Sequence, residues 1–156
     1  MTTAARARPR SGGMLGWALL VAVGGMVGTL ARALLETAVP AAPGTVPWTT
    51  LGINLVGSFV LGALLETLAA SGPDAGRRKA LRLGCGTGVL GGFTTYSTFA
   101  LEVDRLVESG HAGLGIAYAA GSITLGIIAA TAGIAVAATR RPPARPGRPG
   151  SAAGPA

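Results

Sequence analysis

An unusual run of glycine, hydroxyl and aromatic residues lies inside an uncharged, apolar stretch of the chain. Its members are Gly91, Gly92, Phe93, Thr94, Thr95, Tyr96, Ser97, Thr98 and Phe99. A helix gains little from two glycines followed by β-branched threonines, so the run predicts a local break in the helix. Within a membrane, irregular backbone survives only where it faces water or other protein, and its freed carbonyl groups can bind a cation.

The aromatic residues of this run are suited to a small anion. Tyr96 and Phe99 are three residues apart, so they share one helix face. The edge of an aromatic ring is positive, and two ring edges solvate an anion without the full charge that would trap it. Weak, repeated sites favour conduction over storage. Tyr118 and Ser122 are four residues apart and add hydroxyl donors along one face of the last apolar stretch.

Two further features of the apolar stretches concern contacts between helices. Asn54 lies in the string from Asn54 to Ser58, where Ser58 is the only other polar residue, and its amide needs a partner in another helix, a pore water or an ion. Simple attachment of one helix to another, worth about 0.6–2 kcal/mol, remains an alternative. Glycines recur every four residues at Gly24 and Gly28, and again at Gly84, Gly88 and Gly92, a spacing that favours close helix packing.

The elements that carry these residues are four uncharged windows, 11–31, 37–65, 83–101 and 112–139, each at least 19 residues long. About 20 helical residues cross a bilayer, and no window alternates with period two, which favours helices over a barrel. We predict an all-α membrane protein with one domain over residues 14–139. It has four transmembrane helices, the third broken near its middle. The flanking basic tails, residues 1–13 and 140–156, have a composition that predicts disorder.

The composition excludes several other classes of protein. Only 12% of the 156 residues are charged, too few to solubilise four apolar helices in so short a chain. The basic start followed by an apolar run resembles a secretory signal, but the run continues to Leu35 with Arg32 embedded near its end. Cys85 is the only cysteine, which excludes an internal disulfide and a cysteine metal cluster. We expect no enzymatic activity.

The basic residues are distributed unevenly between the two sides. An even number of crossings places both termini and the loop after the second span together. That side carries eleven of the thirteen basic residues, whereas the opposite loops, residues 38–47 and 109–113, carry none. The positive-inside rule therefore predicts cytoplasmic termini in the plasma membrane. No aromatic platform accompanies the arginines, so the net charge of +7 does not indicate a nucleic-acid partner.

These residues resemble the small bacterial fluoride channels of the Fluc or CrcB family over about residues 24–133. The most specific part is the run from Gly91 to Phe99 followed by Glu102. The resemblance implies an antiparallel dimer of four-helix subunits with two fluoride pathways and a structural sodium ion at its centre. The implied activity is passive export of fluoride, which enters cells as neutral HF and is trapped when it ionises.

The resemblance also implies roles for individual residues. The carbonyl groups of Gly91 and Thr94 would coordinate sodium, and Arg32 would attract anions to an aqueous vestibule. The residues expected along the fluoride pathways are Asn54, Thr95, Tyr96, Ser97, Phe99, Tyr118 and Ser122. Tyr96 is a departure, because phenylalanine is the usual occupant of that position, and Ala100 replaces a frequent serine.

The one-sided charge distribution also bears on the partner subunit. It predicts insertion in a single orientation and pairing with a related chain of opposite charge bias, although a homodimer remains open. Two other functions are alternatives. A proton-coupled drug exporter needs a buried carboxylate, and Glu36, Glu66 and Glu102 all lie towards span ends. A nonconducting membrane assembly factor leaves the run from Gly91 to Phe99 unexplained.

Overall fold

The computed structural model describes residues 11–140, and within them every regular element is helical. The elements are α1 (Ser11–Ala38), α2 (Trp48–Ala70), α3 (Gly76–Leu81), the π-helix η1 (Arg82–Leu90), α4 (Gly91–Phe93), α5 (Ser97–Glu108) and α6 (Ala112–Thr139). The predicted N-terminal tail covers residues 1–13, and α1 begins at Ser11, within the last three of these residues. The rest of both predicted tails lies outside the described residues.

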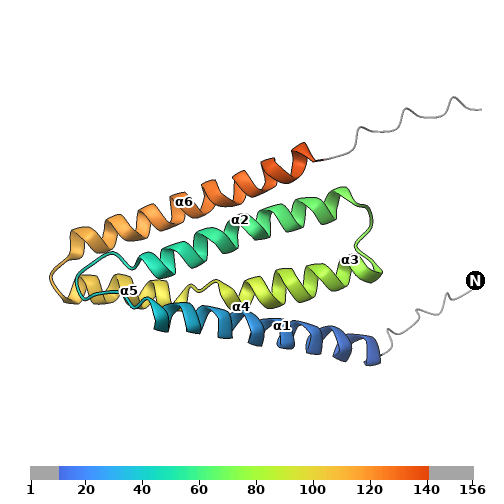
Figure 1. Cartoon of the computed structure of the whole chain (residues 1–156), viewed down its shortest axis with the longest axis horizontal. Helices are drawn as coiled ribbons and strands as arrows, with labels where there is room; N and C mark the ends of the chain where they lie inside the picture. The colour runs from blue at the N-terminus through green and yellow to red at the C-terminus, as the bar shows by residue number, and fades with distance from the viewer. Residues whose placement is uncertain (1–10, 141–156) are drawn as a thin grey trace, which may run out of the picture.

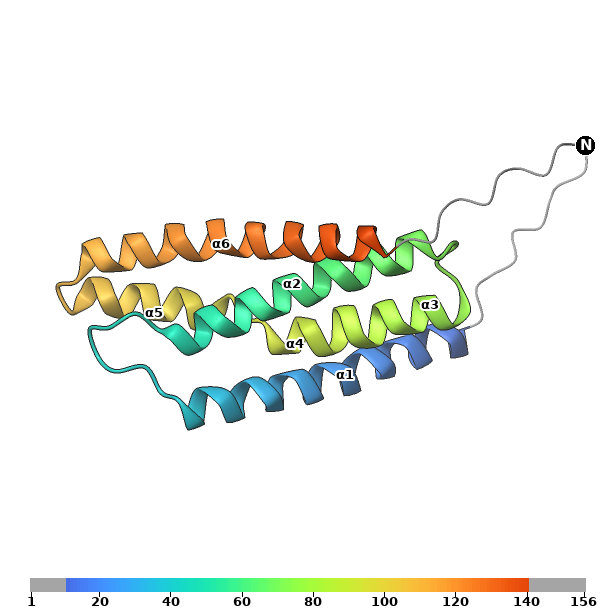
Figure 2. The same ribbon diagram turned by 45° about the horizontal axis from the view of Figure 1, so that its top comes forward.

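The helices form an elongated bundle of parallel and antiparallel rods (Figure 1). Three of them, within Gly13–Ala38, Trp48–Ala70 and Ala112–Thr139, are long and apolar enough to cross a membrane. The segment from α3 to α5 runs lengthwise beside them, as the turned view also shows (Figure 2). The start of α1, the end of α6 and the α2–α3 connection lie at one end of the bundle, and the α1–α2 loop lies at the other (Figure 1).

The surface of the bundle is apolar, and its interior is small. Among the described hydrophobic side chains, Ile53, Leu106 and Tyr118 are buried, whereas many leucines, isoleucines and valines are exposed. An exposed apolar area of this extent is unfavourable in water and favourable in lipid. The distribution fits a multi-pass membrane protein.

Glycines bring the helices together in two pairs. On α1, an added Cβ at Gly28 would overlap the carbonyl oxygen of Val89 in η1, and one at Gly24 would lie 3.1 Å from the Cα of Gly88. On α6, a Cβ at Gly133 would overlap the backbone of Phe59 in α2. These contacts confirm the packing role predicted for the glycine spacing, and they leave α1 packed on η1 and α4, and α2 packed on α6.

The third predicted span is interrupted, as its sequence predicts. The helix ends after Phe93, Thr94 is extended with φ −76° and ψ 153°, and α5 starts at Ser97. The preceding π-helix was not expected. It contains Gly84, Gly86 and Gly88, all buried, and long π-helical stretches are rare.

Candidate functional site

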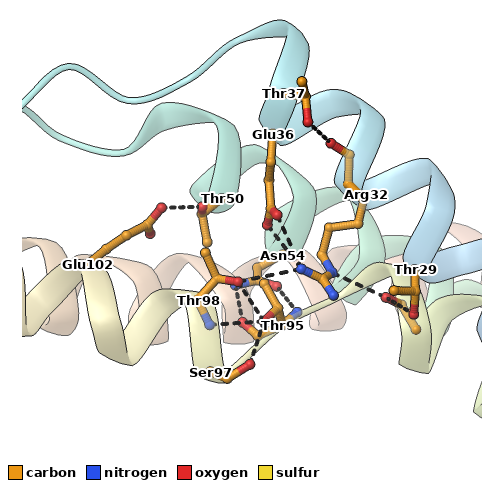
Figure 3. A network of polar contacts seen from close by, with 12 residues as sticks. Thr29, Arg32, Glu36, Thr37, Thr50, Asn54, Thr95, Ser97, Thr98 and Glu102 are labelled. Carbon is orange, nitrogen blue, oxygen red and sulfur yellow. Dashed lines mark hydrogen bonds and ion pairs between the residues drawn. The ribbon is translucent and has the colours of Figure 1, made fainter.

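The interruption is held by an amide from the neighbouring helix α2. Asn54 Nδ2 donates to the carbonyl oxygen of Thr95 at 3.0 Å, and the amide N–H of Thr95 donates to Asn54 Oδ1 at 2.9 Å. One side chain therefore replaces both of the helical partners that Thr95 lacks (Figure 3). The second hydrogen on Nδ2 is left for another acceptor.

Redirecting these amides frees the carbonyl groups before them. In a continuous helix the N–H of Thr95 would bond to Gly91, but it bonds to Asn54. The N–H of Thr98 would bond to Thr94, but it donates to Thr95 Oγ1 at 3.1 Å. Gly91 and Thr94 thus each present a carbonyl oxygen without its helical partner. Carbonyl groups at an unwound point of a membrane helix have the chemistry that coordinates sodium, so this pair fits such an ion.

Arg32 ties α1 to the interruption. Its Nε lies 3.4 Å from the carbonyl oxygen of Gly92, and its Nη1 lies 3.5 Å from Thr98 Oγ1 and 3.2 Å from Glu36 Oε2. Thr29 Oγ1 also donates to the carbonyl of Gly92, at 3.4 Å. The guanidinium is therefore bound on both sides of the break and has a carboxylate beside it (Figure 3). This arrangement compensates its charge and leaves its side chain 20% exposed.

The hydroxyl groups of the run form a cluster at the start of α5. Thr95 Oγ1 lies 3.3 Å from Ser97 Oγ and donates to Thr98 Oγ1 at 3.2 Å. Thr95 is buried, and its Oγ1 also accepts the N–H of Thr98, so it satisfies one of the first amides of α5. The resemblance implied Thr95 and Ser97 as pathway residues, and the structure places both beside Thr98, with Thr95 bonded to Asn54.

The predicted aromatic residues form a row. The ring centroids of Tyr96 and Phe99 are 6.0 Å apart with a 45° angle between planes, and those of Phe99 and Tyr118 are 5.5 Å apart at 48°. Tilted rings at these separations turn positive edges towards shared space. The row begins at Tyr96, which is 81% exposed, and it ends at the buried Tyr118 of α6.

Ser122, one turn after Tyr118 on α6, carries a buried hydroxyl with no hydrogen-bond partner among residues 11–140. Nearly all buried polar groups in proteins are hydrogen-bonded, so an orphaned one needs an explanation. A hydroxyl that binds a passing ion or water would be unpaired when neither is present. The position therefore fits the polar stripe expected from its spacing to Tyr118.

A carboxylate that was not included among the candidate site residues completes this region. Glu102 accepts hydrogen bonds from both sides: Thr50 Oγ1 lies 2.6 Å from Oε1, and the hydroxyl of Tyr118 lies 2.9 Å from Oε2. Thr50 is the most deeply buried polar residue described, at 1% exposure. The three side chains connect α2, α5 and α6 one helical turn beyond the break.

A cavity of about 560 Å³ opens beside this carboxylate, at the end of the bundle that carries the α1–α2 loop. Glu36, Thr50, Thr98, Glu102 and Arg105 lie among its lining residues. Arg32, which was expected at a vestibule, is not among the lining residues, but its ion-pair partner Glu36 is.

Comparison with known proteins identifies the family. A family model described as CrcB-like protein, Camphor Resistance (CrcB), matches residues 19–134. The chain belongs to the CrcB family. A CrcB relative from Leifsonia xyli, named fluoride-specific ion channel FluC 2, is 55% identical over 120 residues, covering 77% of this chain and 82% of the relative.

Two further CrcB relatives carry the same kind of name. Fluoride-specific ion channel FluC 1 of Cutibacterium acnes is 50% identical over 121 residues, covering 78% of this chain and 83% of its own length. Fluoride-specific ion channel FluC of Novosphingobium aromaticivorans is 43% identical over 119 residues, covering 74% and 91%. The resemblance noted from the residues alone is confirmed by these matches.

Sequence reasoning missed several residues of this CrcB chain that the structure brings to the break. Thr50 lies four residues before Asn54, so both point from one face of α2, and this spacing was an available signal. Glu102 lies three residues after Phe99, directly beyond the uncharged window 83–101, where a carboxylate is expected to have a partner. Glu36 lies four residues after Arg32, the spacing of an ion pair on one helix face, whereas Thr29 gave no comparable signal.

Proposed function

We propose that this chain is one subunit of a fluoride channel that exports fluoride passively and lowers its cytoplasmic concentration. The observation that carries the proposal is the row of Tyr96, Phe99 and Tyr118, whose tilted rings run from an exposed surface to the buried Tyr118. The names of the relatives supply the identity of the anion. Ring edges stabilise a small anion weakly enough for it to move on.

Along this path, each polar group has an assigned task. The spare N–H of Asn54 donates to fluoride at the level of Thr95, where Thr95 and Ser97 offer further hydroxyls. Ser122 donates its unpaired hydroxyl near Tyr118. Arg32 attracts the anion at the mouth, while its bonds to Glu36 and Gly92 keep it from binding the anion too tightly. The ion therefore meets several modest donors in succession.

A structural sodium ion is part of the proposal. The carbonyl oxygens of Gly91 and Thr94 would hold it, two from each subunit of an antiparallel dimer. The ion supplies positive charge at the point where two broken helices meet. Support comes from the loss of the helical hydrogen bond at each of these carbonyl groups, which leaves both oxygens available to a ligand.

The subunit is proposed to work as a dimer. In this proposal the segment from α3 to α5 is the third span in chain order and brings the number of spans to four, and residues 14–139 form one channel domain. Tyr96 supports this, because a phenol ring that is 81% exposed at membrane depth has no favourable solvent in lipid. Both termini are assigned to the cytoplasm of the plasma membrane from the basic residues at that end. The same bias favours a companion chain of opposite orientation over a second copy.

Fluoride efflux from liposomes tests the function. Vesicles loaded with fluoride and containing the chain should release it to an external ion-selective electrode, and vesicles containing the Phe99→Ile variant should release it about tenfold or more slowly. If vesicles containing this chain alone release no fluoride, the assay is repeated with a related subunit of reversed charge bias. Efflux of an aromatic cation driven by a proton gradient would identify an exporter instead. No flux from the natural chain in either assembly would favour an assembly factor.

A further inference from the structure

The bundle carries a second cavity at the end opposite the large one. It has a volume of about 290 Å³ and lies between the last turns of α2 and the start of the third segment. Its wall on α2 is apolar and consists of Leu65, Leu68 and Ala69, and its rim is charged and consists of Asp74, Arg78 and Arg82. An apolar wall that ends at a charged rim matches the two parts of a lipid molecule.

The charges at this rim are positive and only partly compensated. Arg82 is paired with Asp74, with Nη2 to Oδ2 at 2.7 Å and Nε to Oδ2 at 3.0 Å. The hydrogen bond from Arg82 holds the pKa of Asp74 below its ordinary value, so this carboxyl stays ionised and serves that one arginine. Arg77 and Arg78 precede it on α3 with no carboxylate partner in the described part of the chain.

Arg78 is positioned rather than free. Its Nη1 donates to the carbonyl oxygen of Pro73 at 3.1 Å, and its guanidinium packs on Gly72, whose φ of +116° suits only glycine. A guanidinium has five donors, so four remain for an oxyanion. Lys79, on the other side of α3, lies 5.2 Å from the ring of Trp17. Tryptophan is typical of the level where lipid headgroups begin.

We propose that this cavity binds one anionic phospholipid. The phosphate lies against the guanidinium group of Arg78 at the rim, which suits phosphate oxygens, and an acyl chain follows Leu65 and Leu68 along α2. Arg77, the preceding residue on α3, adds positive charge near that rim. Free phosphate would use only the rim and leave the apolar wall exposed, so the lipid is the better match to the whole cavity. The lipid anchors the α2–α3 connection to the membrane surface.

A tryptophan placed in the cavity wall reports the lipid directly. In a full chain with Trp17→Phe and Trp48→Phe, Leu65→Trp places the reporter on the wall. Ile134→Trp is the matched control, because both positions lie five residues before their helix ends, Ala70 and Thr139, and are 42% and 43% exposed. Each chain is reconstituted in phosphatidylcholine vesicles containing equal fractions of dibrominated phosphatidylglycerol or dibrominated phosphatidylcholine. Bromine on the acyl chain quenches only if the lipid itself is bound, so free phosphate gives no signal.

The expected result is stronger quenching of Leu65→Trp by the anionic lipid. Because each cation near the surface contributes about 1 kcal/mol, the preference should fall about fivefold for Arg78→Gln, and further for the double variant Arg77→Gln and Arg78→Gln. Arg140→Gln, which removes a cation at the end of α6, should leave it unchanged. Arg78→Gln alone keeps the test valid if the double variant does not insert. Equal quenching by both lipids at Leu65→Trp, or a preference that survives Arg77→Gln and Arg78→Gln, would overturn the proposal.

Discussion

Asn54 and Thr95 are joined by two hydrogen bonds that run in opposite directions between one amide side chain and one backbone position. The pair is separated by 41 residues in sequence and connects α2 to the interruption between α4 and α5. It satisfies both backbone groups of Thr95 at a point where neither has a helical partner. The interruption therefore depends on a residue in another helix.

Replacing Asn54 tests this dependence. Asn54→Leu removes both bonds and should lower the thermal stability of the detergent-solubilised protein, at a cost of about 1–3 kcal/mol for each unpaired backbone group. Asn54→Asp keeps an acceptor for the Thr95 N–H but places a second oxygen against the carbonyl oxygen of Thr95. We expect this repulsion to disturb the break, so fluoride flux should fall. Thr124→Val is the control, because Thr124 bonds only to Ala120 of its own helix. An Asn54→Leu protein as stable as this control would contradict the assigned role.

Ser122 should behave in the opposite way. Its buried hydroxyl has no partner among residues 11–140, so Ser122→Ala removes an unpaired polar group and should leave stability unchanged or raise it by up to about 1 kcal/mol. Fluoride flux should nevertheless decrease, because the hydroxyl is assigned to the ion. Thermal unfolding and liposome efflux measured on the same preparation separate the two effects. A loss of stability together with flux would indicate a purely structural hydroxyl.

The ring row predicts unequal effects of two substitutions. Phe99 lies between the other two rings, and Phe99→Ile should reduce fluoride flux by about tenfold or more, which needs a loss of only about 1.4 kcal/mol of anion stabilisation. The exposed Tyr96 has no hydrogen bond from its hydroxyl within the described subunit, so Tyr96→Phe should fold normally and conduct within about twofold of the natural chain. Abolition of flux by Tyr96→Phe would show that the phenol oxygen itself serves the ion.

Two glycines of α6 provide a matched test of helix packing. A Cβ at Gly133 would overlap the carbonyl oxygen of Phe59 and lie 3.0 Å from the amide nitrogen of Ala63, whereas nothing lies within 4 Å of a Cβ at Gly121. Gly133→Ala should therefore destabilise the protein by about 1–3 kcal/mol or more, since overpacking displaces backbone. Gly121→Ala should be neutral in the same unfolding assay. Equal tolerance of both would mean that α2 and α6 are packed less tightly than described.

The orientation of the subunit can be measured directly. Reporter fusions at the carboxyl terminus, one active only in the cytoplasm and one only outside it, should show a single cytoplasmic population because the basic residues gather at that end. A fusion in the α1–α2 loop should give the reverse pattern. Comparable populations on both sides would remove the argument for a companion chain and favour a homodimer.

Much of the fold was predictable because its signals are local. Each uncharged window falls on one helical segment, and the window 112–139 coincides with α6, although the window 37–65 starts 11 residues before α2. The two glycines before Thr94 predict the break. The closeness of Tyr96 to Phe99 follows from their spacing on one helix. The family follows from these same strings, since the run from Gly91 to Phe99 is specific enough to identify it.

The contacts that hold the site were beyond prediction because they join distant positions. Thr50 meets Glu102 across 52 residues, and Arg32 reaches Gly92 across 60. Periodicity shows which residues share a face of one helix, but not which face of another helix they meet. The π-helix was missed for a related reason, since its wide turns depend on glycines packed against α1 rather than on a local preference.

The freed carbonyl oxygen of Gly91 depends on tertiary packing as well as on the local sequence. Without α2 in place, the amide of Thr95 would have Gly91 as its helical acceptor, because the competing partner that Asn54 supplies would be missing. A subunit whose second helix is displaced is therefore expected to cover the oxygen that its break exposes.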